Sequence, residues 1–151
     1  MNFIDLKLDL LKDRIQRKDD QFLFDPVRRK WIKFSSEEYV RQLMLIYLHD
    51  VLGYGYSTMA VERMIKLNGL SKRFDIVVFN RKGEAFILIE CKSFNHQLSQ
   101  DVWDQVSRYN CVLASSWLCI TTGIQSLIVK IDFENSKISA ENTLPVYSNN
   151  S

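Results

Sequence analysis

Two apolar stretches, FDIVVF at residues 74–79 and AFILIECK at residues 85–92, are the strongest structural signal in the sequence. Both are rich in β-branched and aromatic residues and nearly continuous in apolar character, which is typical of buried strands. The segment NRKG at residues 80–83 separates them and has the composition of a tight turn. We therefore expect two neighbouring antiparallel strands at the centre of a sheet.

Each of these strands carries an acid where the pattern is otherwise that of a buried strand. Glu90 ends the apolar run at residues 86–89, and Asp75 lies inside the first stretch. An ionised carboxylate is costly in such surroundings unless it is paired or binds a cation. Alternation along the strand places Glu90 and Lys92 on one face, about 7 Å apart. Antiparallel pairing can bring Asp75 next to Glu90.

Two carboxylates and a lysine at a strand end suit a Mg²⁺-dependent phosphodiesterase. Mg²⁺ prefers oxygen ligands and is commonly held by one or two carboxylates together with water and substrate phosphate. Such a metal polarises the scissile phosphate and acidifies a bound water, while a lysine holds that water or stabilises developing charge. The alternative is structural: Glu90 and Lys92 form an ordinary salt bridge and Asp75 pairs with Arg73. The residues alone leave both interpretations open.

The sequence around these strands predicts an α/β domain with a mixed sheet. Ser35 and Glu38 have the spacing of a capping box, which opens a helix that runs to about residue 52. Its apolar stripe is expected to comprise Val40, Leu43, Met44, Tyr47 and Val51. Further strands are expected at residues 59–67, 117–121, 126–133 and 137–139, and a second helix at about residues 99–113.

The chain is expected to form a single domain over residues 1–147, followed by a polar tail at residues 148–151. An N-terminal β extension is predicted at about residues 10–33, with short strands at 14–16 and 22–24 around a turn at 18–20. The core is predicted at about residues 35–133, with the order helix, three strands, helix, strand. A small β addition comes after it.

Composition narrows the class of protein. The 151 residues carry a formal net charge of only +2, so net charge does not identify a nucleic-acid binder. Basic clusters could form a phosphate-facing surface or simply be solvated: Arg28, Arg29, Lys30 and Lys33; Lys66, Lys72 and Arg73; Arg81 and Lys82. Three cysteines without a C-x-x-C pair argue against a disulfide framework and a structural zinc site. Without a signal peptide or an apolar run of about 20 residues, we expect a cytoplasmic protein with reduced thiols and no membrane association.

The motifs resemble the PD-(D/E)xK nucleases, and more narrowly the N-terminal nuclease domain of type I restriction enzyme R subunits. RFDIVV at 73–78 and ILIECK at 87–92 carry the resemblance. FDPVRRK at 24–30, SEEYVRQ at 36–42 and DQVSRYN at 104–110 extend it, the last fitting a Q-x-x-x-Y motif. It covers roughly residues 20–135. Phe74 stands where the family motif has proline.

The resemblance implies a restriction-endonuclease-like fold and Mg²⁺-dependent DNA cleavage, with Mn²⁺ able to substitute. Asp75, Glu90 and the backbone carbonyl of Cys91 would be the metal ligands. Lys92 would be the catalytic base or an electrostatic helper. Gln105 and Tyr109, four residues apart on one helix, would support the site or touch DNA, although Tyr109 also fits the helix's apolar stripe.

An acid on the first helix commonly completes such sites, and Glu37 and Glu38 are both candidates. Glu38 has a capping role of its own, whereas Glu37 is expected nearer the core; Glu62 is a weaker candidate. Surface solvation explains the arginines equally well, but three of them are candidates to orient acids or contact DNA phosphates: Arg41, Arg73 and Arg108.

The sequence lacks the G-x-x-x-x-G-K-[ST] phosphate loop, so we expect neither a nucleotide cofactor nor an ATP-driven motor, and a full restriction enzyme is excluded. We expect a DNA endonuclease that stands alone, forms a homodimer or belongs to a larger restriction or repair assembly. The alternatives are a DNA-binding module of the same fold that does not cleave, and an interaction protein whose acids form ordinary ion pairs.

Overall fold

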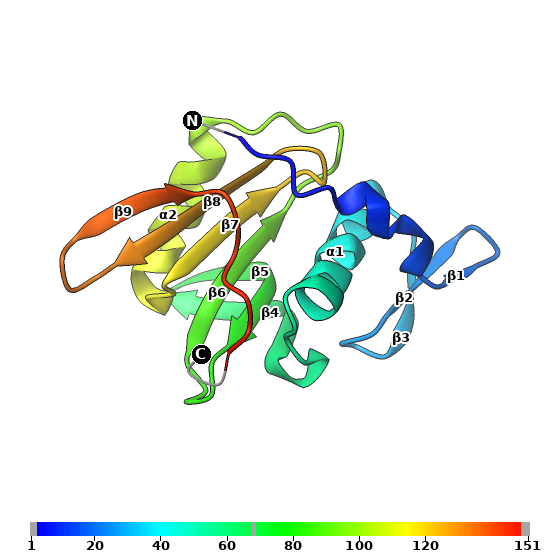
Figure 1. Ribbon diagram of the computed structural model, residues 1–151, viewed down its shortest axis with the longest axis horizontal. Helices are drawn as coiled ribbons and strands as arrows, with labels where there is room; N and C mark the ends of the chain where they lie inside the picture. The colour runs from blue at the N-terminus through cyan, green and yellow to red at the C-terminus, as the bar shows by residue number, and fades with distance from the viewer. Residues whose placement is uncertain (1–2, 68, 149–151) are drawn as a thin grey trace.

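A six-stranded mixed sheet forms the centre of the computed structural model, which describes residues 3–67 and 69–148 (Figure 1). The side chains at positions 65, 67, 70, 105, 106, 109 and 111–113 lie outside this description. The strands stand in sequence order: β4 (Met59–Leu67), β5 (Leu70–Phe79), β6 (Ala85–Cys91), β7 (Trp117–Thr121), β8 (Ser126–Asp132) and β9 (Lys137–Glu141). β6 and β7 are parallel and the other neighbours antiparallel, so the predicted mixed sheet is confirmed.

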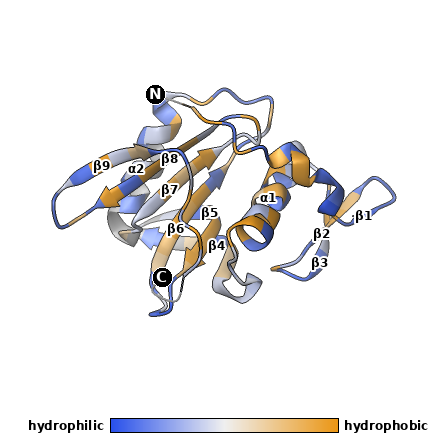
Figure 2. Ribbon diagram, viewed as in Figure 1, coloured by the Kyte–Doolittle hydropathy of each residue, from blue (hydrophilic) through white to orange (hydrophobic). Residues whose placement is uncertain are grey.

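One helix covers each face of this sheet. α1 (Ser36–Ile46) packs on one face, and α2 (Gln100–Leu113) crosses the other as the connection from β6 to β7 (Figure 1). Parallel neighbours need such a crossover. Figure 2 shows apolar residues along the central strands and on α1. The order of the predicted core, helix, three strands, helix and strand, is the order observed.

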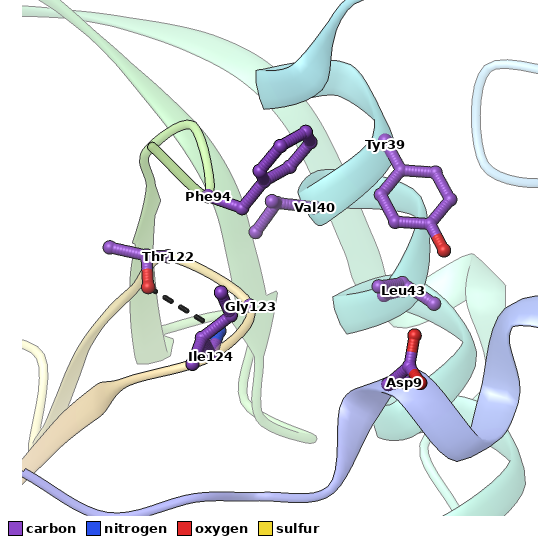
Figure 3. A pocket seen from close by; sticks show the side chains of 8 residues that line it. All are labelled: Asp9, Tyr39, Val40, Leu43, Phe94, Thr122, Gly123 and Ile124. Carbon is purple, nitrogen blue, oxygen red and sulfur yellow. Dashed lines mark hydrogen bonds between the residues drawn. The ribbon is translucent and has the colours of Figure 1, made fainter. Parts of the chain in front are cut away.

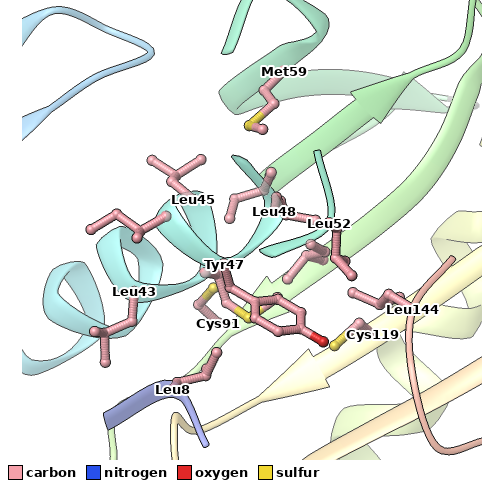
Figure 4. Packing of buried hydrophobic residues seen from close by; sticks show 14 of the residues in the cluster. Leu8, Leu43, Leu45, Tyr47, Leu48, Leu52, Met59, Cys91, Cys119 and Leu144 are labelled. Atoms are coloured by element: carbon pink, nitrogen blue, oxygen red, sulfur yellow. The ribbon is translucent and has the colours of Figure 1, made fainter. Parts of the chain in front are cut away.

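The larger apolar cluster lies between α1 and the sheet (Figure 4). It includes Leu43, Met44 and Leu48 from the helical side, and Cys91 and Cys119 from the sheet. Both of these cysteines are free and buried. A second cluster fills the α2 side, with these buried members: Phe74, Val77, Leu88, Leu118, Ile120 and Val129.

α1 begins as predicted, because the Ser35 hydroxyl accepts a hydrogen bond from the Glu38 N–H at 3.0 Å. The helix continues into a π-helical turn, η2 (Tyr47–Val51), and the chain then leaves it at Gly53, with φ +87°. A π turn takes more residues per turn than an α-helix, so it changes the direction in which its side chains point. Val51 is therefore 52% exposed, and its predicted place on the apolar stripe is wrong.

The N-terminal region forms a separate three-stranded sheet beyond α1 (Figure 1). Its strands are β1 (Arg17–Lys18), β2 (Phe22–Asp25) and β3 (Lys30–Lys33). The predicted hairpin around residues 18–20 is present, but the strand expected at 14–16 is wrong. The chain up to Arg14 forms a 3₁₀ helix instead, η1 (Leu8–Arg14), since Leu8 and Leu11 are buried three residues apart.

The chain returns to the α1 side after β9. Leu144 is fully buried there, and the Tyr54 hydroxyl donates to the Pro145 carbonyl at 2.8 Å. A further short 3₁₀ turn, η3 (Tyr56–Thr58), precedes β4. Of the predicted polar tail, residues 149–151 lie outside the described part of the chain. No helix in that described part is long and apolar enough to cross a bilayer.

Candidate active site

The two predicted acids lie where strands β5 and β6 begin to separate. The pairing of these strands runs from Phe79–Ala85 to Ile76–Ile89, and Asp75 and Glu90 lie one residue beyond the last pair on each strand. The Cys91 N–H donates to Asp75 Oδ2 at 2.7 Å, so a side chain takes the place of a backbone acceptor. Strand pairing therefore brings the two carboxylates together.

Glu90 is buried, with 6% of the residue exposed. Burial raises its pKa to about 8, helped by a hydrogen bond to the Asp75 carboxyl group and by the negative charge of Asp75. Lys72 Nζ lies 3.3 Å from Glu90 Oε2, yet this oxygen has no partner with hydrogen-bond geometry among the described residues. We regard the contact as a charge interaction. Without another cation, these surroundings therefore favour the protonated form of Glu90.

Lys92 belongs to the same cluster. It directly follows β6, and its backbone N–H donates to the Thr121 carbonyl at 2.8 Å, which extends the β6–β7 edge by one residue. Its positive charge acts to lower the pKa of both Glu90 and Glu37. The structure thus places the predicted lysine beside the predicted acids.

The two candidate acids on α1 take opposite positions from those expected. Glu38 is 7% exposed, whereas the side chain of Glu37 is 50% exposed, so the expectation that Glu37 lies nearer the core is wrong. The Glu38 carboxylate does not return to the helix start but contacts arginines. Glu37 faces Asp75 from the solvent side: burial and the charge of Asp75 raise its pKa.

Arg41 lies inside the cluster rather than on a DNA-facing surface. Its guanidinium contacts the Glu38 carboxylate and donates from Nη2 to Asp75 Oδ1 at 2.7 Å. Burial acts to lower its pKa, but the hydrogen bond and the charges of Asp75 and Glu38 outweigh that effect and raise it. Of the two roles predicted for Arg41, its 4% exposure favours the orientation of acids over contact with phosphates.

Sequence reasoning missed the second half of this cluster. Arg28 Nε contacts Asp25 Oδ2 at 2.7 Å, and its Nη2 contacts Glu38. Gln42 donates to Asp25 and to Glu38 at 3.0 and 3.1 Å. These contacts join the N-terminal sheet to α1. The sequence alone does not show that Asp25 is buried or that Arg28 contacts Glu38. Both depend on how the N-terminal sheet packs against α1.

Glu62 also joins the cluster, although it was predicted only as a weak candidate. Its carboxylate lies 3.3 Å from Arg28 Nη1 and 3.5 Å from Arg41 Nη2. The backbone at Glu62 has φ +56°, a left-handed conformation that is unfavourable for a residue other than glycine. Such strain inside a strand persists only where surrounding contacts hold it, and the two arginines provide them.

The cluster carries more negative than positive formal charge. Within the described residues, six carboxylates contact or face four cations, an excess of two negative charges when all are ionised. The carboxylates are Asp25, Glu37, Glu38, Glu62, Asp75 and Glu90; the cations are Arg28, Arg41, Lys72 and Lys92. This excess equals the charge of one divalent ion.

The other predicted site residues are not brought into the cluster by described contacts. Arg73 and Arg108 are exposed. Gln105 and Tyr109 lie on α2, but their side chains fall outside the described part of the structure. Cys91 contacts Asp75 through its N–H, and its carbonyl remains a predicted ligand.

The donor set fits a divalent ion held partly by the protein. No group of three acidic, histidine or cysteine side chains in residues 3–67 and 69–148 is arranged to hold a metal by itself. Asp75 and Glu90 offer two adjoining carboxylates, and one buried Glu90 oxygen lacks a hydrogen bond. Two carboxylates with water and phosphate suffice for Mg²⁺. One Asp75 oxygen, however, is already occupied by Arg41.

A cavity of about 440 Å³ lies on the other side of α1, beside the β7–β8 turn (Figure 3). Tyr39 and Phe94 line it together with aliphatic residues, and Gly123 approaches Val40 closely there. None of the predicted catalytic residues whose side chains the structure describes lines this cavity. The candidate chemistry therefore belongs to the carboxylate cluster.

Comparison with known proteins relates the chain to the N-terminal region of restriction enzyme subunits. The sequence model of a family described as type I restriction enzyme R protein N terminus (HSDR_N) matches residues 36–145, which include α1, the whole central sheet and α2. A search of curated proteins gave no match.

A solved structure shares the fold. It is a fragment described as an HsdR subunit of a type I restriction enzyme from Vibrio vulnificus YJ016, with a TM-score of 0.51 and 17% sequence identity. The alignment covers 73% of this chain and 23% of that fragment. This chain thus matches less than a quarter of the relative's length.

Proposed function

The chain belongs to the family of type I restriction enzyme R protein N-termini, and from that premise we propose that it is a Mg²⁺-dependent DNA endonuclease of the PD-(D/E)xK class with a restriction-endonuclease-like core. The observation that carries the proposal is the meeting of Asp75, Glu90 and Lys92 at the point where β5 and β6 separate. Their adjoining carboxylates and the excess negative charge around them are what a divalent ion needs.

The roles follow from the positions of the side chains. Asp75 and Glu90 would hold Mg²⁺, with the carbonyl of Cys91 as a further ligand. When bound, the ion supplies a polarised phosphate and a water of lowered pKa. Lys92, whose charge acts on Glu90, would orient that water or stabilise charge on the phosphate.

Neighbouring residues would support the ligands rather than react. The Cys91 N–H fixes one oxygen of Asp75, and Arg41 orients the other. Glu37, half-exposed and facing Asp75, is the α1 acid that could act through water on the ion. Glu38 is committed to Arg28, Arg41 and Gln42, which favours Glu37 as the functional acid of the pair.

The test is cleavage of plasmid and oligonucleotide DNA with Mg²⁺ or Mn²⁺. Asp75→Asn, Glu90→Gln and Lys92→Ala should each lower the cleavage rate by about 100-fold or more, the usual effect of losing one group that stabilises the transition state. Glu134→Gln and Lys137→Ala, at exposed positions, are matched controls and should cleave like the wild type. Equal activity in all variants would point to a contaminating nuclease and contradict the proposal.

The contacts of Asp75 also support a second candidate, a DNA-binding module that does not cleave. Both of its oxygens already accept hydrogen bonds, from Arg41 and from the Cys91 N–H. In that case DNA affinity would survive Asp75→Asn, and Mg²⁺ would change neither cleavage nor affinity. DNA is the partner in both cases, and assembly with other restriction subunits is a further proposal from the family.

A further inference from the structure

Arg41 supplies the positive charge that contacts Asp75 in this structure. Its side chain is 5% exposed, and Nη2 lies 2.7 Å from Asp75 Oδ1. The other Asp75 oxygen accepts the Cys91 N–H. A divalent ion at Asp75 would lie within a few ångströms of this guanidinium, where two positive charges repel strongly. The arginine and the ion therefore compete for one carboxylate.

The Glu38 carboxylate has partners other than Arg41. Its carboxylate contacts Arg28 Nη2 and accepts a hydrogen bond from Gln42 Nε2 at 3.1 Å. A shift of the Arg41 guanidinium would leave Glu38 with two partners. Asp75, in contrast, would lose its only described side-chain cation and would need another.

Two further acids offer the guanidinium a second position. Glu62 Oε1 lies 3.5 Å and Glu37 Oε1 3.9 Å from Arg41 Nη2. Their side chains are 37% and 50% exposed, so they stand on the solvent side of the cluster. A small rotation of the arginine side chain toward them would keep its charge paired.

The hydrogen bonding of the cluster is incomplete as it stands. Three buried side-chain polar atoms lack a hydrogen-bond partner in the described part of the chain: Arg41 Nε, Gln42 Oε1 and Glu90 Oε2. All three belong to the cluster. Most buried polar groups are satisfied, so such a concentration indicates a missing ligand or an alternative arrangement.

We propose that Arg41 is a built-in counter-ion that occupies Asp75 until a divalent cation displaces it toward Glu37 and Glu62. This inference rests on the proposed metal site and adds a means of regulating it. Arg41 lowers the affinity of the site for the cation and keeps the carboxylates paired in its absence. α1, which carries Arg41 and Glu37, thereby responds to the state of the site.

The proposal is tested by whether the affinity for Mn²⁺ rises or falls when Arg41 is replaced. Isothermal titration calorimetry with Mn²⁺ alone is compared for the wild type, Arg41→Gln and Asp75→Asn. Arg41→Gln removes the charge but keeps an amide donor, so Mn²⁺ should bind about tenfold more tightly or better, the scale of removing one repelling charge at short range. Asp75→Asn should bind Mn²⁺ more weakly than the wild type. Circular dichroism and the melting temperature without metal show whether each variant folds.

The outcomes separate this inference from the proposed function. Mn²⁺ binding that is unchanged or weaker in a folded Arg41→Gln protein overturns the competition, because Arg41 would then be neutral toward the ion or would position Asp75 for it. If neither the wild type nor Arg41→Gln binds Mn²⁺, the proposed metal site does not exist and the inference falls with it.

A second measurement needs no variant. Phenylglyoxal modifies accessible guanidinium groups, and mass spectrometry reports the modified fraction of Arg41 with and without saturating Mn²⁺. We expect labelling of Arg41 to rise by severalfold with Mn²⁺, while the exposed Arg108 stays constant. Labelling of Arg41 that is unchanged or falls, in protein shown to bind Mn²⁺, contradicts the displacement.

Discussion

At the scale of single residues, Asp75 has two roles, one in the proposed chemistry and one in the stability of the fold. It pairs with a buried arginine and accepts the N–H of Cys91. A buried ion pair contributes little net stability, but removing one partner leaves an uncompensated charge. A loss of activity on mutation of Asp75 therefore needs a measurement of folding beside it.

Asp75→Ala should lower the free energy of unfolding by about 3 kcal/mol, because the buried Arg41 loses one of its acidic partners and the Cys91 N–H loses its acceptor. The double variant Asp75→Ala/Arg41→Met should recover part of that loss, since both charges are then absent. Urea denaturation followed by circular dichroism measures both. A single variant within about 0.5 kcal/mol of the wild type, the range of ordinary surface changes, would mean that the pair is not buried in solution.

Glu90 makes the stability of the metal-free protein depend on pH. Burial and Asp75 raise its folded pKa to about 8, from an ordinary value of 4.5. Between these two pH values the folded state binds more protons than the unfolded state. The stability that proton binding at Glu90 contributes is therefore fully present below pH 4.5 and is lost as the pH rises through 8. We expect Glu90→Gln to gain melting temperature relative to the wild type from about pH 5 to about pH 8.5 in EDTA. A constant difference would show that Glu90 is ionised throughout.

At the scale of elements, strands β4 and β5 continue beyond the pairing with β6. β5 pairs with β6 only from Ile76 onward, whereas β4 and β5 remain paired to Leu67–Leu70. Phe74 packs on the α2 side, so alternation turns Arg73 to the α1 side, together with its partner Met64. Lys66 lies on the same face. This two-stranded ribbon thus carries exposed cations next to Asp75.

We expect the ribbon to contact DNA phosphates. No ion pair joins Lys66 or Arg73 to an acid among the described residues, and both are exposed. Each of Lys66→Ala and Arg73→Ala should reduce the slope of log K against log salt by about 0.9 for duplex DNA. Fluorescence anisotropy in EDTA measures this without cleavage. Slopes equal to that of the Lys137→Ala control would assign these cations to solvation alone.

The sequence predicted the elements that depend on local patterns. β4 and β7 have the expected limits, and the Ser35 cap is where its spacing placed it. The closeness of Asp75 and Glu90 followed from two apolar runs and a tight turn. These features need only strand alternation and short-range turn chemistry.

Other features depend on contacts between distant segments. Glu38 is buried because Arg28, ten residues earlier, folds back from the N-terminal sheet onto α1. The π turn after Ile46 moved Val51 to the surface, and no composition signal announced it. The sequence indicated the surroundings of Arg41 only in part. Glu37 and Glu38 precede it by four and three residues, a spacing at which side chains on a helix can contact each other.

At the scale of the whole molecule, the family match covers both helices and the central sheet, while the HsdR fragment is much longer than the part that aligns. The return of the chain at Leu144 packs into the apolar cluster on the α1 side of the sheet. The N-terminal sheet reaches the carboxylate cluster through Asp25 and Arg28. If the proposed site cuts one DNA strand at a time, cleavage of a duplex calls for two copies or a partner.

The proposed metal site is best tested by diffraction from crystals soaked in Mn²⁺, recorded at the manganese absorption edge. We expect an anomalous peak about 2.0–2.2 Å from carboxylate oxygens of both Asp75 and Glu90, the distance at which small divalent ions coordinate oxygen. A well-ordered site at saturating Mn²⁺ with no peak there, or with the ion bound only elsewhere, would contradict it.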